Sequence, residues 1–259
     1  MSSSTPSRDF VPVRIAMWSG PRNLSTALMR SWGSRADTAV VDEPLYAHYL
    51  AATGLHHPGR AEILASQPTD WWVAAERLTG PIPGGASIWY QKHMAHHLLP
   101  TVERAWLDAP GFRHAFLLRE PGPMLASLVK VLGANVRVED TGLPQQVELF
   151  QRIADRDGAA PPVVQARDIL ADPPGMLRAL CAALGVPFDP AMLAWKPGPR
   201  PTDGVWAKHW YATVERSTGF ALPRTSHAQP PASCTAVLAE CERLHAHLVG
   251  FRLRVGSTA

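Results

Sequence analysis

The chain has 259 residues, of which 46% are hydrophobic and 18% are charged. A chain of this length and composition can bury one large core without dividing into several domains. Its formal net charge of +3 at pH 7 is mild and contains no basic run, so an anionic small ligand fits it better than a nucleic acid. No stretch reaches the roughly 18 to 20 apolar residues of a membrane span, and the N-terminus has no apolar signal core. We therefore expect a cytoplasmic protein with no membrane span.

Segments typical of strands and of helices alternate along the chain, which predicts the α/β class. The predicted strands are Val13–Trp18, Ala39–Val41, Ser87–Gln91, His114–Leu118 and Val163–Ala166. The predicted helices are Leu24–Trp32, Leu45–Ala52, His97–Trp106, Gly122–Leu132, Gln145–Asp155, Met176–Leu184 and Thr235–His247. Residues 1–12 are rich in Ser, Thr and Pro and are expected to form a flexible arm, while 13–259 form a single domain.

The turn after the first predicted strand has the composition of an anion site. It reads SGPRNLST over residues 19–26 and leads directly into a helix. Unpaired backbone N–H groups at the helix start, the Arg22 cation and the hydroxyls of Ser25 and Thr26 would then point at one place. The alternative is an ordinary strand-to-helix turn, with Asn23 or Ser25 as the N-cap. A Walker A loop is excluded, because that motif requires Gly-Lys-Ser/Thr.

A second candidate anion site follows the strand predicted at His114–Leu118. Arg119 ends that strand, Pro121 opens the next helix, and Ser127 comes eight residues after Arg119. A guanidinium can bind a phosphate through two parallel hydrogen bonds, and a hydroxyl adds a further donor. The alternative is an ion pair between Arg119 and Glu120, with Ser127 on a solvated helix face.

Together these two motifs resemble those of sulfotransferases that use 3′-phosphoadenosine-5′-phosphosulfate (PAPS). The phosphosulfate loop of that family reads Pro, basic residue, Ser, Gly, Thr, Thr, and the matching positions here are Pro21, Arg22, Asn23, Leu24, Ser25 and Thr26. Arg119 and Ser127 match the pair that binds the 3′-phosphate, with Glu120 in place of the usual Asp. The resemblance implies a P-loop-like, three-layer αβα domain with a mostly parallel central sheet. It also implies transfer of a sulfuryl group from PAPS, without a metal, to a hydroxyl or amine of a small acceptor.

Three further residues are candidates for the chemistry. Glu43 follows a predicted strand and precedes a proline, which resembles the general base of carbohydrate-type sulfotransferases. Its alternative role is to cap the helix that begins near Leu45, with Asp42 as a structural residue. Lys92 is expected to stabilise the leaving phosphate, and the adjacent His93 is the next candidate base. A zinc site formed by neighbouring histidines lacks a distant third ligand, so no metal site is predicted.

A late segment, 195–208, loosely resembles another loop of the family. It implies that Lys196, Arg200 and Lys208 contact the 3′-phosphate and that Trp206 stacks on adenine. The alternative is a surface loop whose tryptophans close the core. The acceptor pocket is sought within 51–85, around Trp71 and Trp72. A homodimer stays open, as do two other functions: a P-loop kinase-like phosphotransferase, and a catalytically silent binder of phosphorylated nucleotides.

Overall fold

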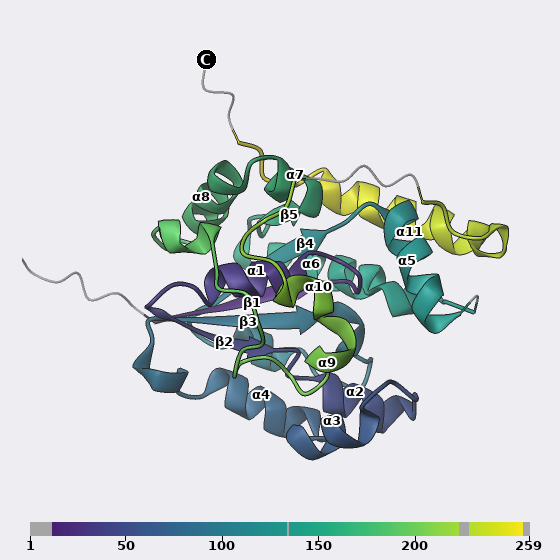
Figure 1. Ribbon diagram of the computed structural model, residues 1–259, viewed down its shortest axis with the longest axis horizontal. Helices are drawn as coiled ribbons and strands as arrows, with labels where there is room; N and C mark the ends of the chain where they lie inside the picture. Colours follow the sequence, from purple (N-terminus) through teal and green to yellow (C-terminus); the bar gives the residue numbers. More distant parts are fainter. Residues whose placement is uncertain (1–11, 134, 223–227, 256–259) are drawn as a thin grey trace, which may run out of the picture.

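The structure is a computed structural model that describes residues 12–133, 135–222 and 228–255. Its centre is a parallel sheet of five strands in the order β2-β3-β1-β4-β5. The strands are β1 (Val13–Ser19), β2 (Thr38–Asp42), β3 (Ile88–Met94), β4 (Phe112–Leu118) and β5 (Val163–Gln165). Helices cover both faces of the sheet (Figure 1). The predicted three-layer α/β class is confirmed. The expected arm at 1–12 lies outside the described residues, apart from Pro12.

Eleven α-helices surround the sheet within the described residues. They are α1 (Ser25–Trp32), α2 (Tyr46–Thr53), α3 (Arg60–Ser66), α4 (Trp71–Thr79), α5 (Pro121–Leu132), α6 (Leu143–Asp157), α7 (Ala166–Ala171), α8 (Pro173–Ala183), α9 (Ala207–Trp210), α10 (Ala212–Glu215) and α11 (Thr235–Val249). None of these described helices has the length and apolar character needed to cross a membrane.

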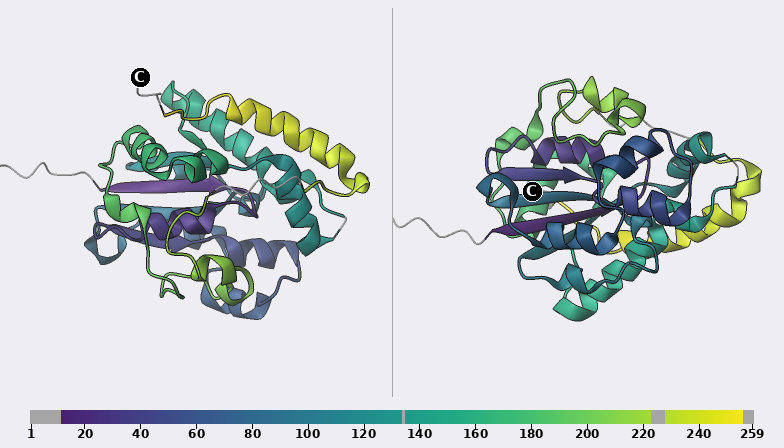
Figure 2. Two further views of the ribbon diagram at one scale, coloured as in Figure 1. Left: turned by 45° about the horizontal axis from the view of Figure 1, so that its top comes forward. Right: turned by 90° about the horizontal axis from the view of Figure 1, so that it is seen from below.

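Alternation along β1 explains the two-sided core. Ile15 and Met17 point into one apolar cluster, which α1, α7 and α8 complete. Ala16 and Trp18 point into the other cluster, which α5, α6 and α11 complete. A parallel strand in the middle of a sheet is buried on both faces, so it reads as a continuous apolar run, as β1 does. Figure 2 shows the helical layers on the two sides of the sheet.

The helix predicted at His97–Trp106 is wrong. The segment instead contains two short 3₁₀ turns, Ala95–His97 and Ala105–Asp108, joined by irregular backbone. Pro100 falls in the middle of it, where a proline removes an N–H donor and disfavours helical backbone at the preceding residue.

The carboxyl ends of β1, β2, β3 and β4 lie at one edge of the sheet because all the strands run parallel. The register places Ser19 of β1 beside Met94 and Leu117, and Asp42 of β2 beside Lys92. In open α/β sheets ligands bind outside this edge. The loops that follow the four strands therefore define where a site is expected.

Candidate active site

A cavity of about 430 Å³ opens at the carboxyl edge of the sheet. The loop between β1 and α1 forms one part of its wall, the ends of β2 and β3 form the floor, and α5 and the chain after α9 form the far side. The sequence-predicted residues that line it are Pro21, Arg22, Asn23, Leu24, Ser25, Thr26, Glu43, Lys92 and Arg119. The predicted phosphosulfate loop and the predicted catalytic pair of Glu43 and Lys92 thus share one cavity.

The β1–α1 loop has a tightly constrained path. A Cβ atom on Gly20 would lie 2.3 Å from the backbone oxygen of Thr141, so no larger residue fits there without a shift of the backbone. Asn23 donates from Nδ2 to the Leu117 oxygen at 2.8 Å and accepts from the Leu24 N–H at 2.7 Å. Asn23 therefore fastens the loop to the end of β4.

Helix α1 presents an open N-terminus to the cavity. No side chain caps it and no acidic residue lies in its first turn, so the N-cap role considered for Asn23 or Ser25 is not formed. The unpaired N–H groups of a first turn and the helix dipole attract an anion. Arg22, just before the helix, has a φ of 58°, a left-handed conformation that is uncommon outside glycine and concentrates at functional sites.

The two predicted anion motifs form one cluster. Arg22 Nε donates to Ser127 Oγ at 3.0 Å, and Arg119 donates from Nη1 to the backbone oxygen of Arg22. Within the described residues neither guanidinium forms an ion pair with a carboxylate. Glu120 instead contacts Gln165 at 2.9 Å and Arg167 at 3.3 Å, so the alternative pairing with Arg119 is not observed. Two neighbouring guanidiniums that form no ion pair within the described residues make this side of the cavity suited to an anion.

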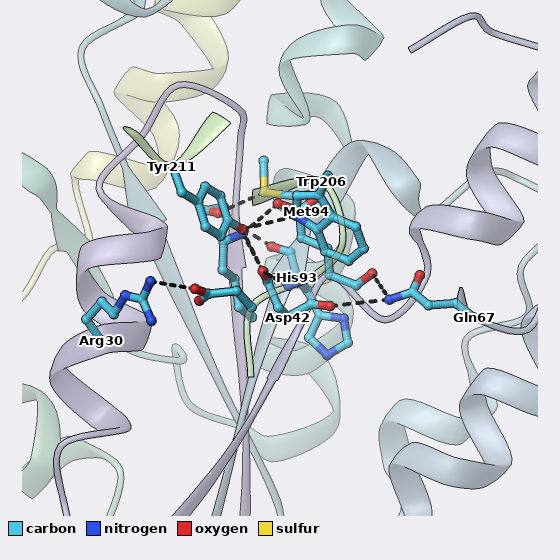
Figure 3. Close-up of polar contacts among 12 residues, drawn as sticks. Arg30, Asp42, Gln67, His93, Met94, Trp206 and Tyr211 are labelled. Atoms are coloured by element: carbon cyan, nitrogen blue, oxygen red, sulfur yellow. Dashed lines mark hydrogen bonds and ion pairs between the residues drawn. The ribbon is translucent and has the colours of Figure 1, made fainter. Parts of the chain in front are cut away.

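The floor of the cavity is a buried network around Lys92. Figure 3 labels two of its members, Asp42 and Tyr211. The lysine Nζ donates to Asp42 Oδ1 at 2.8 Å, to Glu43 Oε1 at 2.5 Å and to the Tyr211 hydroxyl at 2.9 Å. Asp42 Oδ2 also accepts from Tyr211 at 2.7 Å and from the Gly204 N–H at 3.1 Å. All three ammonium hydrogens of Lys92 are therefore used inside the protein.

The two carboxylates of this network differ in access. The Asp42 side chain is 2% exposed, whereas that of Glu43 is 12% exposed and borders the cavity. Burial raises the pKa of Glu43 above its ordinary value, with Lys92 opposing and Asp42 adding to the rise. For Lys92 the negative groups outweigh burial, and Asp42, Glu43 and Tyr211 raise its pKa well above the ordinary lysine value. Glu43 is thus the carboxylate of this network that a ligand can reach, beside a cation that stays protonated.

The backbone also marks Glu43 as unusual. Its φ is 40°, and with Arg22 it is one of two non-glycine residues with positive φ within the described ranges. Gln67 donates to the Glu43 oxygen at 3.1 Å and holds this conformation. The Glu43 side chain points to Lys92, and no side chain caps α2, so the capping role considered for Glu43 is not formed.

A wall of rings closes the side of the cavity next to Glu43. We call it the ring wall, and it comprises Tyr46, Tyr49, His57, His96 and His97. His97 stacks on Tyr46 with the ring centres 4.7 Å apart and on Tyr49 at 4.8 Å. No local sequence pattern predicts this wall, because its members come from α2, from the loop before α3 and from the 3₁₀ turn after β3.

His93 lies on the opposite side of the sheet from the cavity. It stacks on Trp18 with the ring centres 4.3 Å apart, and its Nε2 bonds to Gln91 at 3.2 Å. Burial lowers the pKa of His93 to about 3. Since side chains alternate along β3, Lys92 and Met94 face the cavity and His93 does not.

The late loop does not reach the cavity. Lys208 pairs with Glu62 at 2.6 Å on the surface, Arg200 approaches the Gly33 oxygen at 3.5 Å, and Lys196 is exposed. Trp206 is 1% exposed and donates from its indole to the Tyr211 hydroxyl at 3.1 Å, so its ring is a core element. The aromatic residues from this part of the chain that do line the cavity are Trp210, Tyr211 and Phe220.

Of the acceptor segment sought within 51–85, only His57 lines the cavity, while Trp71 and Trp72 lie elsewhere. The three histidines His93, His96 and His97 do not converge as ligands, since His93 occupies the other face of β3. Within the described ranges, no group of three or more His, Cys, Asp or Glu side chains is arranged to hold a metal ion.

The fold and this cavity define a sulfotransferase domain. The family model described as "Sulfotransferase domain" matches residues 13–239, and the chain belongs to that family. A sulfotransferase domain from the curacin biosynthetic pathway has a similar structure, with a TM-score of 0.53 and 15% identity over 94% of this chain and 99% of that one. A sulfotransferase from Alicyclobacillus acidocaldarius gives a TM-score of 0.53 and 17% identity over 94% of this chain and 98% of that one.

Two curated proteins of Arabidopsis thaliana are closer in sequence. Branched-chain-amino-acid aminotransferase-like protein 1 is 38% identical over 214 residues, which cover 82% of this chain and 37% of that protein. Branched-chain-amino-acid aminotransferase-like protein 2 is 33% identical over 234 residues, which cover 89% of this chain and 40% of that protein. The chain thus spans about two fifths of the length of these curated relatives.

Proposed function

We propose that this protein transfers a sulfuryl group from PAPS to a hydroxyl or amine of a small acceptor. The observation that carries the proposal is the cluster of Arg22, Ser127 and Arg119 beside the open N-terminus of α1. PAPS has two anionic ends, a 5′-phosphosulfate and a 3′-phosphate. The cluster and the helix N-terminus supply cations, hydroxyls and N–H groups for both.

The donor contacts follow from this placement. The first turn of α1, with the hydroxyls of Ser25 and Thr26, would bind the 5′-phosphosulfate, and Arg119 with Ser127 would bind the 3′-phosphate. Adenine needs an aromatic or apolar surface. Phe220, which lines the cavity, supplies it in place of the buried Trp206.

Glu43 is assigned as the general base. It accepts the proton of the acceptor hydroxyl while the acceptor oxygen bonds to sulfur. The bond from sulfur to the bridging phosphate oxygen breaks, and 3′-phosphoadenosine-5′-phosphate (PAP) leaves. The raised pKa of Glu43 favours this role, because it brings the base closer to the working pH.

Lys92 links the proton transfer to departure of the phosphate. Its three ammonium hydrogens are held by Asp42, Glu43 and Tyr211 before reaction. Once Glu43 has taken the acceptor proton, it becomes a neutral and weaker partner for Lys92. One N–H of Lys92 is then released to the bridging oxygen, where negative charge develops.

Thermal-shift measurements with PAP, ATP and ADP, each with and without Mg²⁺, test the donor assignment. PAP should stabilise the protein most and should not need the metal, because binding to the native state raises the unfolding temperature. Stabilisation by ATP with Mg²⁺ but not by PAP would replace the proposal with the kinase-like alternative. Stabilisation by PAP without any sulfuryl transfer would leave a silent nucleotide binder.

A further inference from the structure

The ring wall is a packed and rigid surface. In addition to its two stacks, His97 meets His96 with the ring centres 4.4 Å apart, and Tyr49 meets His96 edge-on at 5.2 Å. Tyr46 and His57 are joined by a hydrogen bond of 2.8 Å. All five rings border the cavity, and the backbone N–H of Tyr46 donates to the Glu43 backbone oxygen at 3.0 Å, so the wall adjoins Glu43.

The wall carries no charge near neutral pH. Burial lowers the pKa of His96 to about 3 and also lowers the pKa values of His97 and His57 below the ordinary histidine value. Burial also raises the pKa of Tyr49 to about 12 and raises that of Tyr46 above the ordinary tyrosine value. A ligand against this wall therefore meets neutral rings.

The wall nevertheless offers polar atoms. His97 is 2% exposed, and among the described residues its imidazole forms no hydrogen bond with another side chain or with the backbone. The same holds for the hydroxyl of Tyr49, which is 5% exposed. Because His97 and Tyr49 line the cavity, these polar atoms can form a hydrogen bond with a ligand.

Cations that could bind an anionic acceptor are absent from the described part of the wall. The cations lining the cavity there are Arg22 and Arg119, on the donor side, and Lys92, whose hydrogens are all used. Asp140, the one other charged residue on the described lining besides Glu43, accepts from the Arg137 N–H at 2.8 Å and pairs with its guanidinium at 3.4 Å.

The adjoining cavity, of about 750 Å³, has an acidic lining. It shares Tyr49, His96 and Asp140 with the first cavity. Its described lining has four carboxylates against two guanidiniums, an excess of two negative charges: Glu103, Glu139, Asp140 and Glu148 against Arg104 and Arg137. An acceptor that extends past the wall therefore meets a surface that repels anions.

We propose that the ring wall is the acceptor subsite and that the acceptor is an uncharged, hydroxyl-bearing ring compound without carboxylate or phosphate groups. This inference rests on the proposed function. The flat face of the acceptor lies against Tyr46, Tyr49 and the histidines, its reacting hydroxyl faces Glu43, and a further polar group meets His97. Two sources share this chemistry: an aryl alcohol, which stacks through its π face, and a sugar, which stacks through its C–H face.

Matched acceptor pairs test the inference, with PAPS as donor and PAP release as the readout. The aryl pair is 3-(4-hydroxyphenyl)propanamide and 3-(4-hydroxyphenyl)propanoate, which differ in charge but hardly in shape. The sugar pair is methyl β-glucoside and methyl β-glucuronide. We expect the neutral member of at least one pair to exceed its anionic partner at least tenfold in kcat/KM. The pair that reacts identifies the source.

A matched pair of variants tests the wall itself. Tyr49→Leu removes a ring and Tyr49→Phe keeps it, so Tyr49→Leu should lower kcat/KM for the neutral acceptor at least tenfold and Tyr49→Phe less than threefold. Both should bind PAP with a Kd within twofold of the parent protein. If Tyr49→Leu does not fold, the binding of each neutral and anionic compound to the parent protein saturated with PAP, measured by calorimetry, gives the same comparison.

Three results would overturn the inference. These are an anionic member equal to or better than its neutral partner, transfer only to open-chain alcohols, or equal kcat/KM in Tyr49→Leu and the parent protein. Failure of the proposed function has a different signature, since PAP would then not bind or no acceptor of any class would release PAP from PAPS; the inference falls with it.

Discussion

Arg22 Nε donates a hydrogen bond of 3.0 Å to Ser127 Oγ, across 105 positions of the sequence. Arg119 completes the contact by donating to the backbone oxygen of Arg22. The two anion motifs are therefore in direct contact, so a substitution in one of them also removes a contact of the other. The first test takes this contact into account.

Replacing Arg119 by Ala should weaken PAP binding at least tenfold, because a charge-assisted contact to a phosphate contributes roughly 1.5–3 kcal/mol. Adenosine-5′-phosphosulfate lacks the 3′-phosphate. The fold-loss of affinity that Arg119→Ala causes should therefore be at least ten times smaller for this ligand than for PAP. The loss that remains for adenosine-5′-phosphosulfate reports the contact between Arg119 and the Arg22 backbone. Calorimetric titrations of both ligands make the comparison, and equal losses would remove Arg119 from the 3′-phosphate site.

Replacing Glu43 by Gln keeps the shape of the side chain and removes the proton acceptor. We expect kcat to fall by roughly two to four orders of magnitude, the usual contribution of a placed base, while the Kd for PAP stays within threefold. Glu62→Gln is the matched control, since Glu62 pairs with Lys208 at 2.6 Å on the surface and does not border the cavity. Normal turnover in Glu43→Gln would exclude Glu43 as the base.

The pH dependence follows from the raised pKa of Glu43, which burial causes. As a base Glu43 must be ionised, so kcat should rise with pH through an inflection above the ordinary glutamate value of 4.5. Because the pKa is higher in the folded than in the unfolded protein, ionised Glu43 lowers stability. The contribution is favourable below the unfolded pKa and is lost as the pH rises through the folded pKa.

Glu43→Gln lacks this titration. Its unfolding free energy should therefore increase relative to that of the parent protein as the pH rises from the unfolded to the folded pKa of Glu43. Denaturant unfolding of both proteins at several pH values measures the difference. A difference that stays constant with pH, or that moves in favour of the parent protein, would contradict the raised pKa.

Variants of Phe220 and Lys208 distinguish PAP binding in the cavity from PAP binding by the late loop, 195–208. Phe220→Ala should weaken PAP binding, because stacking of a base on an aromatic ring contributes about 1–3 kcal/mol. Lys208→Ala should leave PAP affinity within twofold, since Lys208 pairs with Glu62 away from the cavity. A large loss of PAP affinity in Lys208→Ala, together with unchanged PAP affinity in Phe220→Ala, would indicate that the late loop forms part of the donor site.

The sheet could be predicted because buried parallel strands leave short apolar runs between turns. In four of the five strands the apolar run is followed by a polar or charged residue at the carboxyl edge of the sheet. These residues, at or near the strand ends, are Ser19, Asp42, Lys92 and Arg119. Helices α3 and α4 were not predicted. They are short and partly exposed, and only Ile63 of α3 is buried.

The choice between neighbouring side chains needed the structure. The third strand was predicted to end at Gln91, but it continues to Met94, so alternation along it places Lys92 on the cavity side and His93 on the opposite side. The ring wall and the bond between Arg22 and Ser127 join segments distant in sequence, which no local pattern reveals.

The most direct test of the central claim is transfer of ³⁵S from labelled PAPS to an organic acceptor in the presence of EDTA. A sulfuryl group carries less charge than a γ-phosphoryl group, so transfer should not require a divalent metal. The account predicts that label moves to a neutral ring alcohol with release of one PAP per product, and that Glu43→Gln abolishes most of this transfer while still binding PAP. No transfer of label to any acceptor, or turnover that appears only with ATP and Mg²⁺, would contradict it.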